Sequence, residues 1–237
     1  MFTLHNGDGI QFMRSLQSQS IGAIITDPPY GLDFQGESWD SFIPEWIAEA
    51  RRVAKIVAFT TAPTTQWDYP RPEWVNNWYR AGSTSRTSAG GFNHWSPVLV
   101  YGKVKFMVDT YVTAAALTGM QNKGIEHPSP KDLGLYRWLI DNTSNEGETI
   151  LDPFMGSGTT GVAALQLKRV FIGCELKAEY FAIAEKRIKS AALSPALFTP
   201  SNNRLHHDGG YSPAQQALFT PEERPAPKGK ATPARRR

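Results

Sequence analysis

Short apolar segments alternate along this chain with segments whose apolar residues recur every three or four positions. Five strand-like segments lie at 23–26, 55–60, 96–103, 149–154 and 169–175. Four helical patterns lie at 43–54, 134–144, 159–168 and 178–191. Apolar strands separated by amphipathic helices are typical of a mostly parallel sheet with helices on both faces. The expected fold class is therefore α/β, with a mostly parallel twisted sheet.

The composition is that of an ordinary globular protein, with 41% hydrophobic and 20% charged residues. The single cysteine, Cys174, excludes an intramolecular disulfide, and the five histidines have no spacing typical of a zinc site. No metal is expected. The absence of a signal peptide and of a long apolar run predicts a cytoplasmic protein without a membrane span.

An acidic and proline-rich loop, Asp27-Pro28-Pro29-Tyr30, follows the first strand-like segment. Prolines end a strand because they have no N–H for the ladder. Ligands of open α/β sheets bind outside the carboxyl ends of the strands. A carboxylate and an aromatic ring held at such an end therefore predict a binding site, and a plain proline turn is the alternative.

A second loop carries Gly156, Gly158 and Gly161, in the spacing G-x-G-x-x-G between a strand and a helix. Glycines in this pattern allow a tight turn and a close approach of the backbone to a ligand. Glu175 ends the next strand, where an acid can accept hydrogen bonds from ribose hydroxyls. The pattern predicts a nucleoside site, and glycines needed only for packing are the alternative.

The sequences DPPY at 27–30 and DPFMGSGTT at 152–160 together resemble the S-adenosylmethionine-dependent DNA amino-methyltransferases. In that family the first motif forms the catalytic pocket and the second binds the methyl donor. The segments HNGDGIQFM, HPSPKDLGLYRWLI and IGCELKAEYFAIAEKRI extend the resemblance over most of residues 4–188. Because the catalytic motif comes first, the chain resembles the permuted β class, and the resemblance implies a Rossmann-like methyltransferase fold. Asp27, where related protein and ribosomal RNA enzymes carry Asn, favours DNA as the substrate.

The resemblance implies that the carboxylate of Asp27 and the carbonyl of Pro28 accept the N6 hydrogens of an adenine extruded from duplex DNA. Tyr30 would stack on that base, and Pro29 completes the catalytic motif. The implied donor site consists of Asp8, His127, Lys131, Asp152, Phe154, Gly156, Ser157, Gly158, Thr159 and Glu175. In it Glu175 holds the ribose, Asp8 faces the adenine edge, and Lys131 or His127 closes over the carboxylate. For Asp8 and His127 a role as turn residues is equally open.

Residues 1–193 form the expected catalytic domain, and an insert at about 60–126 is the candidate region for target recognition. Its candidate DNA contacts are Arg80, Arg86 and Asn93, whose side chains can pair with base edges or phosphates. A solvated loop beside a cluster of aromatic residues is the alternative reading.

Residues 194–237 hold seven of the 17 prolines, and seven basic residues against three acidic ones. This composition predicts a flexible basic tail. Its segment QQALF, with Gln215, Leu218 and Phe219, resembles the short peptides that bind the bacterial sliding clamp. The alternative is that the tail docks on the enzyme itself or on the second subunit of a homodimer.

The predicted function is site-specific methylation of adenine N6 in double-stranded DNA, in a bacterial or phage-infected cell and within or outside a restriction-modification system. Methylation of cytosine N4 is the alternative within the class, although Ser would then be more usual in place of Asp27. Two other classes stay open, a nicotinamide-dependent oxidoreductase that uses the glycine motif and a catalytically idle DNA-binding module.

Overall fold

The computed structural model describes residues 1–29, 45–81, 85–86, 92–104, 109–114 and 131–193. Their main feature is an eight-stranded sheet with the strand order β1-β10-β9-β2-β3-β7-β4-β8. Its strands are β1 (Phe2–Asn6), β2 (Ile21–Thr26), β3 (Ala54–Thr60), β4 (Trp74–Ala81), β7 (Trp95–Tyr101), β8 (Thr110–Ala114), β9 (Thr149–Asp152) and β10 (Val170–Glu175). Two short strands, β5 (Ser85–Arg86) and β6 (Phe92–Asn93), pair separately.

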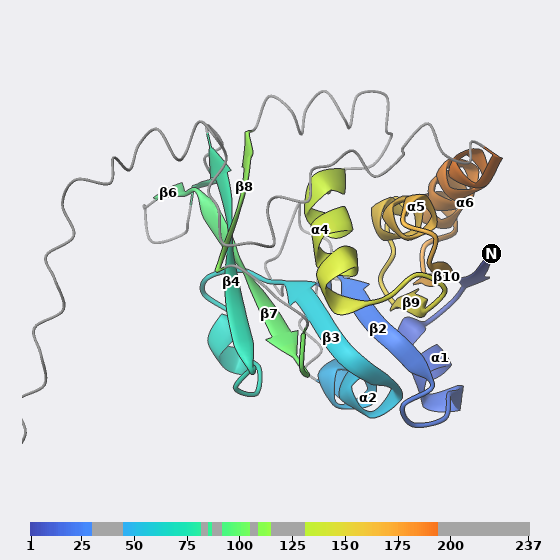
Figure 1. Ribbon diagram of the computed structural model, residues 1–237, viewed down its shortest axis with the longest axis horizontal. Coiled ribbons are helices and arrows are strands. Elements are labelled where there is room, and N and C mark those ends of the chain that lie inside the picture. The colour runs from blue at the N-terminus through green and yellow to red at the C-terminus, as the bar shows by residue number, and fades with distance from the viewer. Residues whose placement is uncertain (30–44, 82–84, 87–91, 105–108, 115–130, 194–237) are drawn as a thin grey trace, which may run out of the picture. The chain divides into compact units, whose positions relative to one another are not determined.

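Helices cover both faces of the sheet (Figure 1). On one face lie α1 (Gly9–Ser15) and α2 (Glu45–Val53), and on the other lie α4 (Leu133–Thr143), α5 (Thr159–Gln166) and α6 (Ala178–Leu193). The 3₁₀ turn η3 (Gln66–Asp68) follows β3. This arrangement confirms the expected α/β fold class. None of the helices in these ranges is long and apolar enough to cross a membrane.

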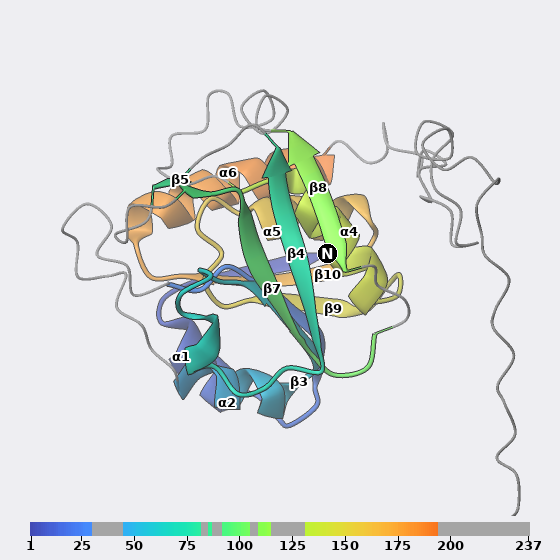
Figure 2. The same cartoon turned by 90° about the vertical axis from the view of Figure 1, so that its left-hand side faces the viewer.

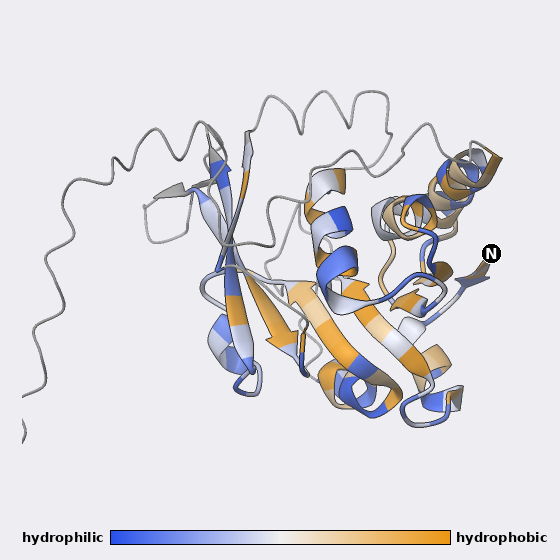
Figure 3. Cartoon of the chain, viewed as in Figure 1, coloured by the Kyte–Doolittle hydropathy of each residue, from blue (hydrophilic) through white to orange (hydrophobic). Residues whose placement is uncertain are grey.

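The central strands are buried from both sides because successive side chains of a strand point to opposite faces. In β2, Ala23 and Ile25 join the core formed with α4, α5 and α6, whereas Ile24 joins the core formed with α1 and α2. All three side chains are fully buried. Figure 3 shows that most of β2 and β3 has the apolar colour. Nearly unbroken apolar strands are what a sheet covered on both faces requires.

One strand of the main sheet runs against its neighbours. The pairs from β1 through β3 are parallel, but β7 is antiparallel to both β3 and β4. Figure 2 shows β4 between β7 and β8. Because β4, β7 and β8 lie within the candidate insert at 60–126, these three strands of that region extend the main sheet, whereas β5 and β6 pair separately.

Strands β2 and β9 are neighbours, although the whole middle of the chain separates them in sequence. They pair in parallel with Ala23 opposite Ile150 and Ile24 opposite Leu151. Both strands therefore end at the same edge, and the residues that directly follow them lie close together. At this position the sheet is a topological switch point, with β10 and β1 continuing to one side and β3 to the other.

Candidate active site

Two carboxylates stand side by side in the fold, at the ends of β2 and β9. Asp27 directly follows β2, and Asp152 is the last residue of β9. The hydroxyl of Thr26 donates to Oδ1 of Asp152 at 2.5 Å, which joins the two strand ends across 126 positions of sequence. The two motifs predicted to cooperate are therefore adjacent at the carboxyl edge of the sheet, where ligands of such sheets bind.

Each carboxylate oxygen of Asp27 has a partner from another element. The buried Thr60, at the end of β3, donates its hydroxyl to Oδ1. The Nζ of Lys131 lies 2.6 Å from Oδ2, and both side chains of this ion pair are about one fifth exposed, at 22% and 18%. Pro28 is buried and Pro29 is half-buried. The carboxylate is thus fixed in orientation at the rim of the site.

Asp152 is more deeply buried, with 2% of its surface exposed. The hydroxyl of Thr160 donates to Oδ2 at 2.5 Å, and the backbone N–H of Phe154 donates to Oδ1 at 3.1 Å. Burial raises the pKa of Asp152 to about 7, even though the hydrogen bonds from Thr160, Thr26 and Phe154 favour the charged form. The group can therefore gain or lose a proton near neutral pH, so a cation binding beside it would shift its charge state.

Glu175 ends β10 and holds the glycine loop in place. Its Oε2 accepts the N–H of Gly156 at 2.9 Å, and its Oε1 accepts the N–H of Lys177 at 2.9 Å. Burial raises the pKa of the Glu175 carboxyl. A carboxylate has about four acceptor positions, so both oxygens keep capacity for the two hydroxyls of a ribose. This geometry fits the predicted nucleoside site.

The second half of the glycine loop faces helix α6. Gly158 has a φ of +79°, and a Cβ built there would lie 3.0 Å from side-chain atoms of Ala184 and Ile188. Arg187 of α6 donates to the carbonyl of Ser157, to its hydroxyl at 2.9 Å, and to the hydroxyl of Thr159 at 3.4 Å. Packing against α6 accounts for the residue types at Gly158, Ser157 and Thr159. A contact from this part of the loop to the methyl donor would therefore come from its backbone.

Asp8 is the N-cap of α1. Its Oδ1 accepts the N–H of Ile10 at 2.8 Å and that of Gln11 at 3.2 Å, so the side chain has the turn role that the sequence left open. The next residue, Gly9, packs against the glycine loop, residues 153–158, because a Cβ there would lie 2.1 Å from the carbonyl oxygen of Pro153. The start of α1 therefore borders the glycine loop.

Two further residues of the donor half have packing roles. The ring of Phe154 contacts Trp46 edge-on, with the ring centroids 5.6 Å apart. Cys174 is fully buried in β10, and burial raises the pKa of its thiol to about 12. A buried neutral thiol is no nucleophile at ordinary pH, in agreement with the strand-packing role that its apolar neighbours predict.

Several predicted residues lie outside the described side chains. They are Tyr30, Arg86, Asn93, His127, Gln215, Leu218 and Phe219. Arg80, at the end of β4, is described, and its guanidinium lies over the ring of Trp78 at 5.0 Å. Its role in DNA binding stays a prediction, as does the domain boundary at residue 193. Within the described ranges, no three acidic, histidine or cysteine side chains gather as metal ligands would.

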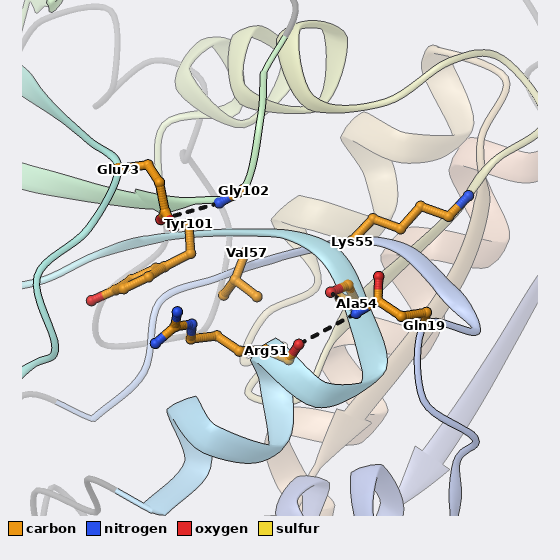
Figure 4. Close-up of a pocket in the computed structure, with 8 residues that line it drawn as sticks. All are labelled: Gln19, Arg51, Ala54, Lys55, Val57, Glu73, Tyr101 and Gly102. Carbon is orange, nitrogen blue, oxygen red and sulfur yellow. Dashed lines mark hydrogen bonds between the residues drawn. The ribbon is translucent and has the colours of Figure 1, made fainter.

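A pocket of about 170 Å³ lies at the opposite end of β3 from Thr60 (Figure 4). It is lined by Gln19, Arg51, Ala54, Lys55, Val57, Glu73, Tyr101 and Gly102. The guanidinium of Arg51 covers the ring of Tyr101 at 5.0 Å, and the Nε2 of Gln19 donates to the carbonyl of Ala54 at 3.1 Å. From Lys55 to Thr60 a strand advances about 17 Å, which separates this pocket from the carboxylates.

Sequence reasoning missed the three threonines that hold the two acids. Thr26 immediately precedes Asp27, Thr60 ends the next strand, and Thr160 lies in the first turn of α5. For Thr26 alone a local signal was available, because it ends a buried strand directly before an acid; Thr60 has no acidic neighbour in the sequence, and Thr160 belongs to a helix. Which carboxylate each hydroxyl serves depends on the order of the strands.

Comparison with known proteins agrees with this geometry. A family model described as DNA methylase (N6_N4_Mtase) matches residues 109–186. Type II methyltransferase M2.MboI of Moraxella bovis is 26% identical, over 78% of this chain and 87% of its own length. DNA adenine methyltransferase YhdJ of Escherichia coli is also 26% identical, over 80% of this chain and 83% of its own. These findings confirm the resemblance to DNA amino-methyltransferases.

Solved structures share the fold. The crystal structure of an M1.HpyAVI–SAM complex superposes with a TM-score of 0.60, at 23% identity over 79% of this chain and all of the other. PvuII DNA methyltransferase, named as cytosine-N4-specific, superposes with a TM-score of 0.58, at 15% identity over 81% of this chain and 91% of its own. The Rossmann-like methyltransferase fold expected from the motifs is therefore confirmed.

Proposed function

We propose that this DNA amino-methyltransferase methylates the N6 amino group of adenine in duplex DNA, with S-adenosylmethionine as the donor. The observation that carries the proposal is the juxtaposition of Asp27 and Asp152 at neighbouring strand ends, joined through Thr26. The carboxylate of Asp27 is about one fifth exposed, at 18%, and that of Asp152 is buried beside the glycine loop. This arrangement supplies one acid to each of two substrates.

The donor side is formed by the chain's own acids and loop backbone. Glu175 offers both carboxylate oxygens to the ribose hydroxyls, while the N–H groups of Gly156 and Lys177 hold those oxygens in position. We assign Asp152 to the ammonium at the methionine end of the donor, and the Thr26 and Thr160 hydroxyls hold its carboxylate in one orientation. When bound, the donor supplies an electrophilic methyl group on sulfur.

The base side is formed by Asp27 and the following proline. The lone pair of adenine N6 is delocalised into the ring, so the amine is a poor nucleophile until its hydrogens are directed. A carboxylate and the Pro28 carbonyl that each accept one N6 hydrogen leave the lone pair aimed at the methyl group. Positioning of this kind supplies up to about 7 to 11 kcal/mol in the best-oriented cases. The target base must be flipped out of the duplex to reach this pocket.

The fixed orientation of Asp27 supports this role. Thr60 holds Oδ1 from β3, and the two prolines restrict the backbone after the acid. A carboxylate that is already oriented loses little freedom when the base arrives, and preorganised acceptors are the most effective ones for charge that develops during the reaction.

Incubation with labelled S-adenosylmethionine and genomic DNA from a strain without methyltransferases, followed by nucleoside analysis, tests the proposal. Labelled N6-methyladenine is the expected product. N4-methylcytosine would instead assign the enzyme to the other amino group that this class methylates, and no label in DNA would contradict the proposal. Sequencing of the methylated DNA by a method that detects modified bases then gives the target sequence.

A further inference from the structure

Lys131 reaches Asp27 from a rigid position. It immediately precedes Asp132, the N-cap of α4, whose Oδ1 accepts the N–H of Leu135 at 2.6 Å. Asp132 is almost fully buried, with 1% exposed surface. The backbone beside Lys131 is thereby anchored, and its Nζ lies 2.6 Å from Oδ2 of Asp27. The position of Lys131 beside Asp27 is therefore set by the start of α4.

This ion pair opposes the role proposed for Asp27. As the methyl group is transferred, positive charge develops on the amine nitrogen, and the carboxylate stabilises that charge through the hydrogen bond it accepts. A carboxylate can accept about four hydrogen bonds, so Asp27 has the capacity to accept one from the base while it is paired with Lys131. An ammonium 2.6 Å away already neutralises the carboxylate, however, and weakens its attraction for a second cation.

We infer that Lys131 is a positioning residue that occupies Asp27 in the ligand-free enzyme and leaves it when the methyl donor binds. The inference rests on the proposed function, because the carboxylate at the methionine end of the donor is the group that would take the ammonium over. Exchange of one carboxylate partner for another keeps the ammonium paired, which avoids the large cost of an unpaired charge in a partly buried site. Donor binding thereby uncovers Asp27 for the base.

The consequence is an ordered and positively coupled binding of the two substrates. Without the donor, the target base must compete with Lys131 for Oδ2 of Asp27. With the donor bound, Lys131 no longer occupies Oδ2, and the hydroxyl of Thr60 keeps its hydrogen bond to Oδ1. Coupling between two ligands of one protein typically changes affinity by about 5- to 150-fold, and it acts equally in both directions.

The ion pair itself is tested in the ligand-free full-length enzyme by acylation of lysines with a small anhydride, read by peptide mass spectrometry. Lys131 should react several-fold more slowly in the wild type than in Asp27→Asn, because the carboxylate holds its ammonium. Lys189, exposed and paired with Glu185 at 2.9 Å, serves as the internal control and should react equally in both proteins. Equal rates for Lys131 would overturn the inference.

The coupling is tested with a duplex that keeps adenine at the target position and carries 2-aminopurine as the neighbouring base, whose emission rises when the target adenine leaves the stack. Duplex affinity is measured alone, with S-adenosylhomocysteine, and with 5′-methylthioadenosine, which lacks the amino-acid end. In the wild type only S-adenosylhomocysteine should tighten binding, by about fivefold or more. In Lys131→Met the emission should rise without any ligand and the coupling should disappear, whereas Lys131→Arg and the surface control Lys189→Met should keep it.

Unchanged coupling in Lys131→Met would overturn the inference, as would full unstacking of the base by the wild type without a ligand. A purely structural role for Lys131 would lower the affinities in all three ligand states alike, and that result would also overturn it. Failure of the proposed function is seen separately, as the absence of N6-methyladenine in the nucleoside assay. The acylation result does not depend on that assay.

Discussion

Replacing Thr160 with valine removes one of the hydroxyls that hold the charged form of Asp152, while keeping the shape of the side chain. Thr160 is buried, and its hydroxyl donates to Oδ2 at 2.5 Å. Burial already raises the pKa of Asp152 to about 7. A hydrogen bond to a charged group contributes about 1.5 to 3 kcal/mol, so its loss should raise this pKa further, by about 1 to 2.

The size of the effect on donor affinity follows from the fraction of Asp152 that is ionised. If the donor ammonium pairs with the carboxylate, only the ionised enzyme binds well. At pH 7 about half of the wild type is ionised, whereas in Thr160→Val the ionised fraction falls to between about one tenth and one hundredth. Donor affinity should then be about 5- to 50-fold weaker than in the wild type at pH 7, and this difference should nearly disappear near pH 9.5, where Asp152 is ionised in both proteins.

Calorimetric titration of S-adenosylhomocysteine between pH 6 and pH 9.5 measures this directly. Buffers with different ionisation enthalpies should in addition report the release of about half a proton on binding at pH 7 in the wild type, because about half of Asp152 is protonated there. Thr143→Val is the matched control, since its buried hydroxyl bonds to the carbonyl of Leu139, within α4 and away from the carboxylates. A loss of affinity in Thr160→Val that is the same at every pH would refute the reasoning.

Three further predictions follow from the site and the tail. Asp27→Ala should abolish methyl transfer without weakening calorimetric donor affinity, because the other motif holds the donor and loss of the carboxylate releases Lys131; an equal loss of both would contradict the assigned role. Glu175→Ala should weaken donor binding by about 1.5 to 3 kcal/mol, and unchanged affinity by calorimetry would argue against a ribose contact. A peptide of residues 212–223 should bind purified sliding clamp, and Leu218→Ala with Phe219→Ala should remove that binding; no binding at high micromolar peptide would end this hypothesis.

The α/β class and the principal buried strands could be predicted from the sequence because the apolar pattern of a strand shows whether one or both of its faces are buried. The run IGAIIT of β2 is apolar at nearly every position, as a strand covered on both faces must be, and the prolines after Asp27 end it. Strand β4 was not predicted, since its Asn76, Asn77 and Arg80 interrupt any apolar pattern. The antiparallel direction of β7 was not predictable either, because alternation of side chains is the same in both directions.

The acids of the site were predictable by the same local reasoning, since Asp27, Asp152 and Glu175 each end a strand or follow one directly. Their hydrogen-bond partners were not. The Thr26 hydroxyl serves Asp152 and not its neighbour Asp27, and Asp27 is held by Thr60 instead. These assignments require β9, β2 and β3 to be adjacent in that order, which is a property of the whole sheet.

The glycine loop and Lys131 show the same division. The sequence alone determined that the chain turns tightly at Gly156 and Gly158, because few other residues adopt a positive φ. Only the tertiary structure decided that Gly158 packs against α6 and that Lys131 pairs with Asp27. Backbone conformation depends on each residue and its immediate neighbours, whereas the balance of charge in a site depends on which groups, distant in the chain, the sheet brings within a few ångströms.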